Sequence, residues 1–337
     1  MRTHAPAMLT AWLIGGGMPA DLFLILFLAL ALDAALGDPP WLYGTVPHPV
    51  AMIGRLVALG DRRLNDERAG EGVRALRGAL LTAAVALLAA ALGWVLTAAL
   101  EGLPGGWLVE AGLASTLIAF RGLYDHAAAV ARALGDSLAE GRAAVAHIVG
   151  RDPDSLDGPG VARAAVESIA ENFSDGVVAP AFWYALLGLP GLCAYKAVNT
   201  LDSMIGHRSP RYRAFGRVAA RLDDAVNWVP ARLAGGLIVL AAALLPGARA
   251  GAAWRTMRRD APRHRSPNAG WQEAAFAGAL GFALAGLRRY RDDAVEDPWM
   301  GDGRADLDAA DIRAALRLYV ATGALLAALV LGLWWLL

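Results

Sequence analysis

Three acidic residues recur at intervals of four in residues 166–176. At this spacing Glu167 and Glu171 share one helix face, and Asp175 continues that face as far as the helix persists, with Gly176 as its expected end. Neighbouring carboxylates repel each other unless positive charge lies opposite, and Mg²⁺ is a hard cation that prefers oxygen ligands. A solvated acidic face is the alternative. The stripe runs directly into apolar sequence, however, which favours a metal site.

The only lysine of the chain lies in a second polar segment. Of the 31 lysine and arginine residues, 30 are arginine, so a position that stays lysine is expected to need a compact point charge instead of a planar fork. On a helix Lys196, Asn199, Thr200 and Ser203 share a face, with Asp202 beside it. An ionisable group so close to apolar sequence is costly unless it is paired or functional. An interfacial ion pair between Lys196 and Asp202 is the alternative to a catalytic role.

Arginines dominate the third polar segment, residues 207–227. Arg213, Arg217 and Arg221 recur every four residues and predict one basic helix face. Guanidinium groups bind phosphate or carboxylate oxygens in pairs, so this face suits an anion. Asp223 and Asn227, also four apart, would complete an oxygen-rich metal site. The alternative is a cytoplasmic helix that lies against anionic lipid headgroups.

Two weaker signals name no function by themselves. His48 lies between prolines in a rigid loop that precedes Arg55, and residues 266–273 form a polar cluster that contains Asn268. The sequence has no phosphate-binding loop of the type Gly-x-x-x-x-Gly-Lys-Ser/Thr, no Gly-x-Ser-x-Gly and no His-Glu-x-x-His. Hydrolase and zinc-enzyme functions therefore lose most of their support.

The composition indicates a membrane protein. Hydrophobic residues make up 57% of the 337 residues and charged residues 18%, below the roughly 25% typical of soluble domains. The net charge of zero gives no basic field for nucleic acid. Cys193 is the only cysteine, which excludes an intrachain disulfide and a cysteine-rich zinc site.

We predict an all-α, polytopic integral membrane protein with about four to six membrane-embedded helices, some of them re-entrant, and helical cytoplasmic loops. The most secure spans are residues 78–100 and 316–337, and shorter ones are residues 22–36 and 233–245. Weaker stretches, broken by Gly, Pro or acidic residues, are 107–120, 177–194 and 274–287. Between the spans, residues 121–175 have a helical pattern with a loop at 151–160.

The distribution of arginines among the loops does not define which side of the membrane each loop faces. Arginines crowd residues 55–77, 208–221 and 249–265, and the marginal spans between these segments cannot all cross a membrane if all three segments are cytoplasmic. We favour cytoplasmic arginine-rich loops, some of whose arginines bind an anionic ligand and carry no topological information.

In order along the chain, these segments resemble the CobD/CbiB family, the membrane-embedded adenosylcobinamide-phosphate (cobinamide) synthases of cobalamin biosynthesis. The matches begin with Leu32-Asp33, Gly37-Asp38-Pro39 and His48-Pro49-Val50 and end with Pro298-Trp299-Met300-Gly301-Asp302. Between them lie residues 53–55, 148–152, 166–180, 194–204, 212–214, 220–224, 230–233, 266–269, 273 and 277–281. The resemblance covers about residues 30–318 and implies one domain over residues 1–337, with the first 20 residues as an extension.

The resemblance implies ATP- and Mg²⁺-dependent formation of an amide between adenosylcobyric acid and (R)-1-aminopropan-2-ol or its O-phosphate. It also implies a bacterial inner-membrane location with a cytoplasmic-facing active site, contact with the lipid bilayer and with other cobalamin-assembly enzymes, and a homo-oligomer. A carboxylate must be activated before an amine attacks it, and phosphoryl transfer needs metal-held phosphates and positive charge.

Residue roles follow from the same resemblance. The catalytic group would be Lys196, Asn199 and Asp202, with Lys196 on the transferring phosphoryl group and Asp202 either orienting Lys196 or accepting a proton from the amine. Mg²⁺ ligands would be Glu167, Glu171, Asp175, Asp223 and Asp224. Substrate and phosphate ligands would be Arg208, Arg211, Arg217, Arg221, His48, Arg55 and Asn268.

A non-catalytic membrane protein on the same scaffold, either a corrinoid transporter or a signalling relative, is the competing class. A transporter is expected to carry paired repeats with broken helices at equivalent positions. The sequence shows no such repeat, and its polar motifs lie at the edges of the apolar segments.

Overall fold

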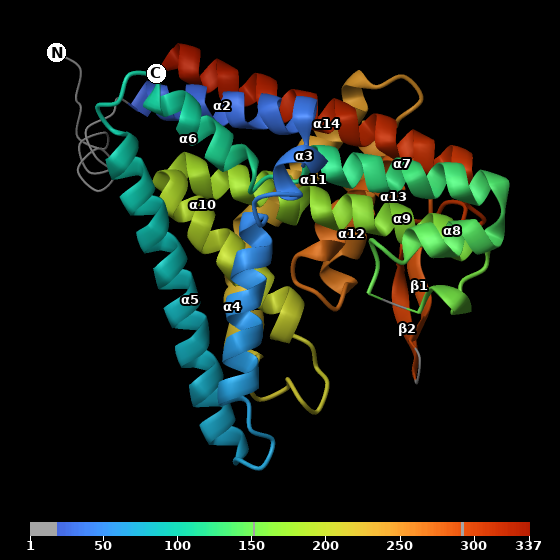
Figure 1. The fold of residues 1–337 in the computed structure, drawn as a ribbon. Helices are drawn as coiled ribbons and strands as arrows, with labels where there is room; N and C mark the ends of the chain where they lie inside the picture. The colour runs from blue at the N-terminus through green and yellow to red at the C-terminus, as the bar shows by residue number, and fades with distance from the viewer. Residues whose placement is uncertain (1–18, 151, 291–292) are drawn as a thin grey trace. The chain divides into compact units, whose positions relative to one another are not determined.

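The computed structural model describes residues 19–150, 152–290 and 293–337 and is almost entirely helical (Figure 1). Its contacts divide the chain into two compact units. The first unit takes its described residues from Met1–Ala119, Ala179–Asn227 and Leu329–Leu337; the second comprises Phe120–Val178 and Trp228–Ala328. The all-α prediction is confirmed, with one short β-hairpin in the second unit. A single domain over the whole chain stays a prediction.

Helices form the described part of the first unit. They are α2 (Pro19–Leu36), α3 (Pro40–Tyr43), α4 (Pro49–Leu64), α5 (Glu71–Leu100), α6 (Gly106–Ser115), α10 (Ala179–Ile205), the first part of α11 (Arg217–Leu244) and the last part of α14 (Ala309–Leu336). Helices α4, α5 and α10 pack against one another, and α2 packs on α6. The core shared by α4, α5 and α10 contains Val57 of α4, Leu81 and Val85 of α5, Leu201 of α10 and Phe215, which lies just before α11.

Two glycines of α5 allow other segments to approach its backbone closely. A Cβ atom on Gly78 would lie 1.8 Å from the carbonyl oxygen of Phe215, and one on Gly93 would lie 2.8 Å from Cα of Pro190. Because backbone atoms block both positions, side chains are excluded there. Gly93 thus brings α5 against the residues that follow a break in α10.

That break lies at Gly188, whose φ of 64° and ψ of −157° are not helical. Residues 177–194 were expected to be an interrupted apolar segment, and the interruption is at Gly188. The expectation that Gly176 ends the preceding helix is wrong, because a π-helical turn, η2 (Ser174–Val178), carries the chain on into α10. A π-helical turn accommodates the glycine by widening the helix instead of ending it.

The described part of the second unit is helical apart from its hairpin. Its elements are α7 (Phe120–Asp136), α8 (Leu138–Val145), the 3₁₀ turn η1 (Pro153–Ser155), α9 (Gly158–Phe173), the rest of α11, α12 (Ala250–Asp260), the 3₁₀ turn η3 (Ala261–Arg263), α13 (Ala269–Leu280), β1 (Leu284–Tyr290), β2 (Asp293–Met300) and most of α14 (Ala309–Leu336). Helix α9 packs against α7, α8 and α13, and α12 packs against α13. The helical pattern expected in residues 121–175 is confirmed, but the loop expected at residues 151–160 ends earlier, because α9 begins at Gly158; residue 151 lies outside the described residues.

Residues 274–287 do not continue as one helix. Helix α13 ends before Gly281, whose left-handed φ of 72° stops it, and the backbone N–H of Phe282 returns to the carbonyl of Ala277 at 2.8 Å. Strand β1 then begins and pairs antiparallel with β2. An apolar run does not reveal such a change by periodicity alone, since short buried strands and helices look alike in sequence.

Four helical segments of the described residues are long and apolar enough to cross a membrane. They are Glu71–Leu100, Gly158–Ile205, Arg217–Leu244 and Ala309–Leu336. Large apolar side chains on α5 are exposed, with Leu87 at 70% and Trp94 at 56%. A soluble domain would seldom expose such a surface, whereas a bilayer covers it. The chain is thus an all-α membrane protein, and the four candidate spans among the described residues fall within the expected range.

Candidate functional site

Two helices of the first unit meet through polar side chains around the single lysine. The hydroxyl of Tyr195 on α10 donates to Oδ1 of Asn227 on α11 at 2.9 Å, and Nδ2 of Asn199 donates to Oδ1 of Asp223 at 3.5 Å. Lys196 lies between these contacts along α10 and is only 9% exposed. The predicted helical face is therefore present, and its lysine is buried at a junction of two helices.

Three carboxylates gather at the same junction. The charges of Asp202 and Asp224 both act on Asp223, which is 8% exposed. The positive charge of Arg208 attracts Asp224, and His207 attracts Asp202. The structure thus joins Asp202, predicted to be catalytic, to Asp223 and Asp224, predicted to be metal ligands. Carboxylates that repel one another are stabilised by a nearby cation.

These carboxylates fit the usual ligands of Mg²⁺. The ion is commonly held by one or two protein carboxylates together with phosphates and water. Within the described ranges, no three His, Cys, Asp or Glu side chains are grouped so that they could hold an ion on their own. Mg²⁺ at Asp223 and Asp224 stays a prediction, in which phosphate oxygens of the substrate complete the coordination.

The loop between α10 and α11 closes on itself beside this group. A Cβ atom on Gly216 would lie 1.6 Å from the carbonyl oxygen of Ile205, and one on Gly206 would lie 1.9 Å from Oδ1 of Asp202. Both ends of residues 206–216 therefore meet at glycines. This close approach fixes the end of α10, which carries Asp202, against the start of α11.

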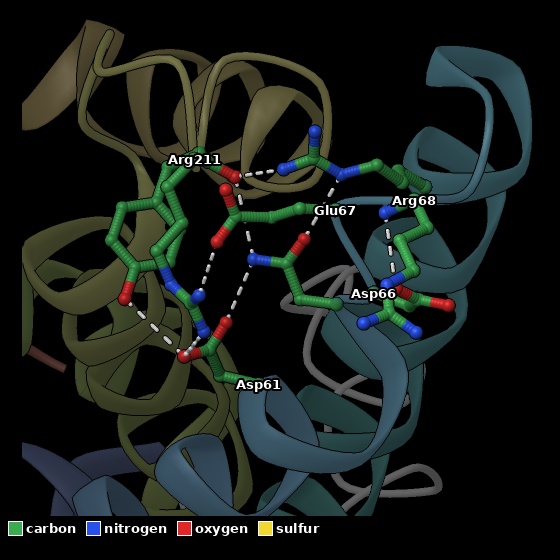
Figure 2. A network of polar contacts seen from close by, with 8 residues as sticks. Asp61, Asp66, Glu67, Arg68 and Arg211 are labelled. Carbon is green, nitrogen blue, oxygen red and sulfur yellow. Dashed lines mark hydrogen bonds and ion pairs between the residues drawn. The ribbon is translucent and has the colours of Figure 1, made fainter.

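Arg211 anchors this loop to the end of α4 and to the residues that follow α4, as Figure 2 shows. Its guanidinium donates to Oδ2 of Asp61 at 2.9 Å and to Oε1 of Glu67 at 2.7 Å. The carbonyl oxygen of Arg211 accepts from Nδ2 of Asn65 at 3.3 Å and from the guanidinium of Arg74. Asp61, Asn65 and Arg74 are all buried. The network holds the loop in place, and a contact between Arg211 and substrate stays a prediction.

Replacing Asp61 with alanine is expected to lower the free energy of unfolding by about 1–3 kcal/mol, because buried donors lose their acceptor. Its carboxylate accepts from Asn65, Arg211 and Tyr212. The measurement is thermal unfolding of the purified protein in detergent. Asp66→Ala is the matched control, since Asp66, in the loop between α4 and α5, accepts one exposed hydrogen bond and is expected to matter by about 0.5 kcal/mol. Equal effects of the two substitutions would contradict a structural role for the network.

The remaining arginines of this segment are less regular than their spacing indicates. Arg217 and Arg221 are exposed on α11, but Arg213 precedes the helix and pairs with Glu71 at 2.7 Å. The prediction of one helix face shared by all three is therefore wrong, because the loop turns until residue 216. Arg217 and Arg221 stay predicted phosphate ligands.

His48 and Arg55 belong to α4. His48 caps the helix by accepting from the backbone N–H of Val50 at 3.2 Å, and its other ring nitrogen lies 3.2 Å from Asp38. Arg55 is exposed, and it follows Gly54, whose position faces Met204 near the end of α10. Arg55 therefore lies close to the end of α10 that carries Asp202. Substrate contacts of His48 and Arg55 stay predictions.

The acidic stripe belongs to the second unit. Glu167 is 3% exposed, and its Oε1 accepts from the backbone N–H of Ala285 at 2.8 Å. Glu171 is exposed and Asp175 half-buried. Because Asp175 lies in the π-helical turn, it does not continue the α-helical register of the other two residues. Their role as Mg²⁺ ligands stays a prediction.

Asn268 lies in a buried polar cluster that spacing in the sequence only partly indicated. Asn268 is 6% exposed, and Gln272 and Glu273, one turn further along α13, are 0% and 2% exposed. Nε2 of His264 lies 3.7 Å from Oε1 of Glu273. Gln272 belongs to the polar run predicted at residues 266–273, whereas His264, two residues before that run, was missed. A substrate role for Asn268 stays a prediction.

An open pocket of about 440 Å³ in the second unit was also missed. It is lined by Asp260, Arg263, Asp297, Pro298, Trp299, Gly301 and Asp302. Arg259 pairs with Asp260 at 2.6 Å and also with Asp302, and the guanidinium of Arg163 lies 5.8 Å from the centre of a Trp299 ring. The carboxylates and the indole ring suit a cationic group. The run at residues 298–302 was the only sequence signal for this pocket.

The contribution of Asp260 to the stability of the fold is expected to depend on pH. Burial by itself raises the pKa of Asp260, but hydrogen bonds from Arg259 and from the backbone N–H of Gly301 outweigh it and lower that pKa below its usual value. A lowered pKa stabilises the fold above about pH 4 and ceases to do so as the pH falls through the folded-state pKa. Asp260→Asn should therefore lower Tm at pH 7 and make progressively less difference below about pH 4. A difference in Tm that does not change with pH would contradict this explanation.

Comparisons with known proteins cover nearly all of these residues. A model of the CobD/CbiB protein family matches residues 26–319. The chain is 49% identical to the cobalamin biosynthesis protein CobD of Brucella anthropi over 313 residues, which cover 92% of the chain and 96% of that protein. It is 50% identical to the protein of the same name from Brucella suis over 315 residues, with 92% and 96% covered. The corresponding protein of Rhizobium meliloti is 49% identical over 308 residues, with 90% and 94% covered. No solved structure matches the chain significantly.

Proposed function

The chain belongs to the CobD/CbiB family, and we propose that it joins adenosylcobyric acid to an amino alcohol in an ATP-dependent reaction. The amine is (R)-1-aminopropan-2-ol O-phosphate or the free aminopropanol, and the product is adenosylcobinamide phosphate or cobinamide. The family and the names of the relatives support a role as an enzyme of cobalamin biosynthesis. The ligase reaction, with ATP and Mg²⁺, is the further step that we propose.

The buried Lys196 carries the proposal, since it lies on α10 between Tyr195 and Asn199, whose side chains bond to Asn227 and Asp223. A carboxylate does not react with an amine at neutral pH, so phosphoryl transfer from ATP must first convert it into an acyl phosphate. Positive charge stabilises the negative charge that develops on the phosphoryl oxygens. Lys196 supplies a fixed ammonium group at 9% exposure, where little water competes for it. When bound, Mg²⁺ would neutralise phosphate charge and orient the phosphates.

Each neighbouring side chain has a distinct task in this proposal. Asn199, which donates to Asp223, orients that carboxylate toward the site. Asp202 accepts a proton from the ammonium group of the amino alcohol, so that the neutral amine attacks the acyl carbon and phosphate leaves. Arg208 and Arg221, exposed next to these residues in sequence, bind the phosphates of ATP or of the amine.

Genetic complementation tests the reaction in cells. A bacterial strain that lacks its own CobD/CbiB protein should grow on supplied adenosylcobyric acid only when this chain is expressed. The same strain should grow on supplied cobinamide without the chain, because the proposed step has then been bypassed. A requirement for the chain on both corrinoids would contradict the amide-forming role and favour corrinoid uptake.

Location and partners follow from the proposed chemistry. ATP is a cytoplasmic substrate, so the site would face the cytoplasm from the bacterial inner membrane. Four apolar helical segments support a multi-pass membrane protein. Contact with other cobalamin-assembly enzymes and homo-oligomerisation stay proposals.

A further inference from the structure

An apolar groove of about 600 Å³ runs along α14 in the second unit. Its walls include Tyr124 of α7, Leu245 beyond α11, and Leu316, Val320, Ala321 and Ala324 of α14. The small side chains of Ala321 and Ala324 leave room for the groove on this face of α14. The groove contains none of the residues assigned above to the reaction.

Two arginines border the same groove. Arg313 and Arg317 are four residues apart, so both guanidinium groups lie on one face of α14, and both are exposed. Within the described parts of the chain, neither donates a hydrogen bond or forms an ion pair. The nearby carboxylate of Asp311 instead pairs with Arg304 at 2.6 Å. Two adjacent guanidinium groups without acceptors suit an anionic phosphate.

The arginines lie where a membrane surface would meet α14. No charged residue follows Arg317 in α14, whose last 19 residues are Leu318–Leu336 and measure about 28 Å at 1.5 Å per residue. That length matches the hydrocarbon core of a bilayer, roughly 30 Å. The guanidinium groups then lie at headgroup depth, and Val320, Ala321 and Ala324 lie at the depth of the acyl chains.

We propose that this groove binds one anionic phospholipid, such as phosphatidylglycerol. Its phosphate contacts Arg313 and Arg317, and the first part of an acyl chain lies along the apolar wall between Leu245 and Val320. An arginine that only anchors a helix at the membrane surface needs no groove beside it. Here the two arginines and the apolar side chains line one groove, with the arginines at headgroup depth and the apolar residues at acyl-chain depth. The site would fasten α14 to α7 through a bound lipid.

Binding by delipidated protein in detergent, followed by native mass spectrometry, tests the site. Phosphatidylglycerol is expected to bind roughly 30-fold more tightly than phosphatidylcholine with the same acyl chains, since each of the two arginines contributes about fivefold near an anionic headgroup. Arg313→Gln with Arg317→Gln should reduce that preference to a few-fold. Ala321→Phe should weaken both lipids, because it fills the acyl wall. Inorganic phosphate at millimolar concentration should not displace the lipid.

Matched controls separate the groove from overall charge. Arg255→Gln with Arg258→Gln removes two exposed arginines from α12 and should leave the preference intact. Arg313→Lys with Arg317→Lys keeps the charge and should retain most of it. Equal binding of the two lipids by the wild type, displacement by inorganic phosphate, or an unchanged preference in the glutamine variant would each overturn the proposal. If the glutamine variant does not fold, the wild-type lipids and Ala321→Phe decide the matter.

Discussion

Replacing Lys196 with arginine is expected to reduce formation of adenosylcobinamide phosphate by about 10²–10³-fold in kcat, the usual effect of losing one charge-stabilising group. The side chain is 9% exposed between two hydrogen-bonded helix contacts, so the larger planar guanidinium has no room to take the same position. The KM for adenosylcobyric acid should change little, because the lost interaction belongs to the transferring phosphoryl group. The measurement is the steady-state rate in membranes that contain equal amounts of each protein.

Leu186→Ala serves as the control for this substitution. Leu186 is exposed on the same helix, and its loss should leave both kcat and KM near wild type. A Lys196→Arg protein that forms product at the wild-type rate would show that only a positive charge is needed there. If the Lys196→Arg protein is absent from the membrane, Lys196→Met is the alternative test. Methionine keeps the approximate length of the side chain without its charge, so this variant should also be inactive.

Replacing Gly216 with alanine is expected to destabilise the first unit by about 3 kcal/mol, the upper end of typical overpacking effects. The added Cβ would lie 1.6 Å from the carbonyl oxygen of Ile205, and this backbone atom cannot move without shifting the end of α10. The shift would displace Asp202 from Asp223 and so should also remove activity. Thermal unfolding and the rate of amide formation are the two measurements.

Gly236→Ala is the matched control, since no atom lies within 4 Å of the added methyl group and the residue belongs to α11. Alanine is the better helix former by about 1 kcal/mol, so this variant should be as stable as wild type or slightly more stable. A Gly216→Ala protein with wild-type Tm and activity would contradict the close approach of residues 206 and 216 to α10.

Apolar runs in the sequence were sufficient to predict the long helices of the fold. The uninterrupted apolar run at residues 78–100 forms α5, and the run at residues 316–337 lies within α14 apart from its last residue. The break at Gly188 was expected only as an interruption within residues 177–194. By contrast, the π-helical turn and the hairpin depend on tertiary contacts, such as the bond from Ala285 to Glu167. Local sequence does not contain such contacts.

The candidate site was predictable to a similar degree. The helical spacing from Lys196 to Asp202 gave the correct face, and the structure adds Asp223 through its contact with Asn199. The ion pairs of Arg211 were not predictable, because its partners Asp61 and Glu67 lie 150 and 144 residues away in sequence. A row of arginines thus looks alike whether its members bind substrate or anchor a loop.

The mass of the corrinoid after incubation with the purified protein in lipid vesicles distinguishes amide formation from transport. With ATP, Mg²⁺, adenosylcobyric acid and aminopropanol phosphate, the corrinoid should gain the mass of the amine less one water, and ATP should be consumed in equal amount. Omission of the amine should leave the corrinoid mass unchanged. A corrinoid of unchanged mass that accumulates inside the vesicles in the complete mixture would contradict the account and identify a transporter.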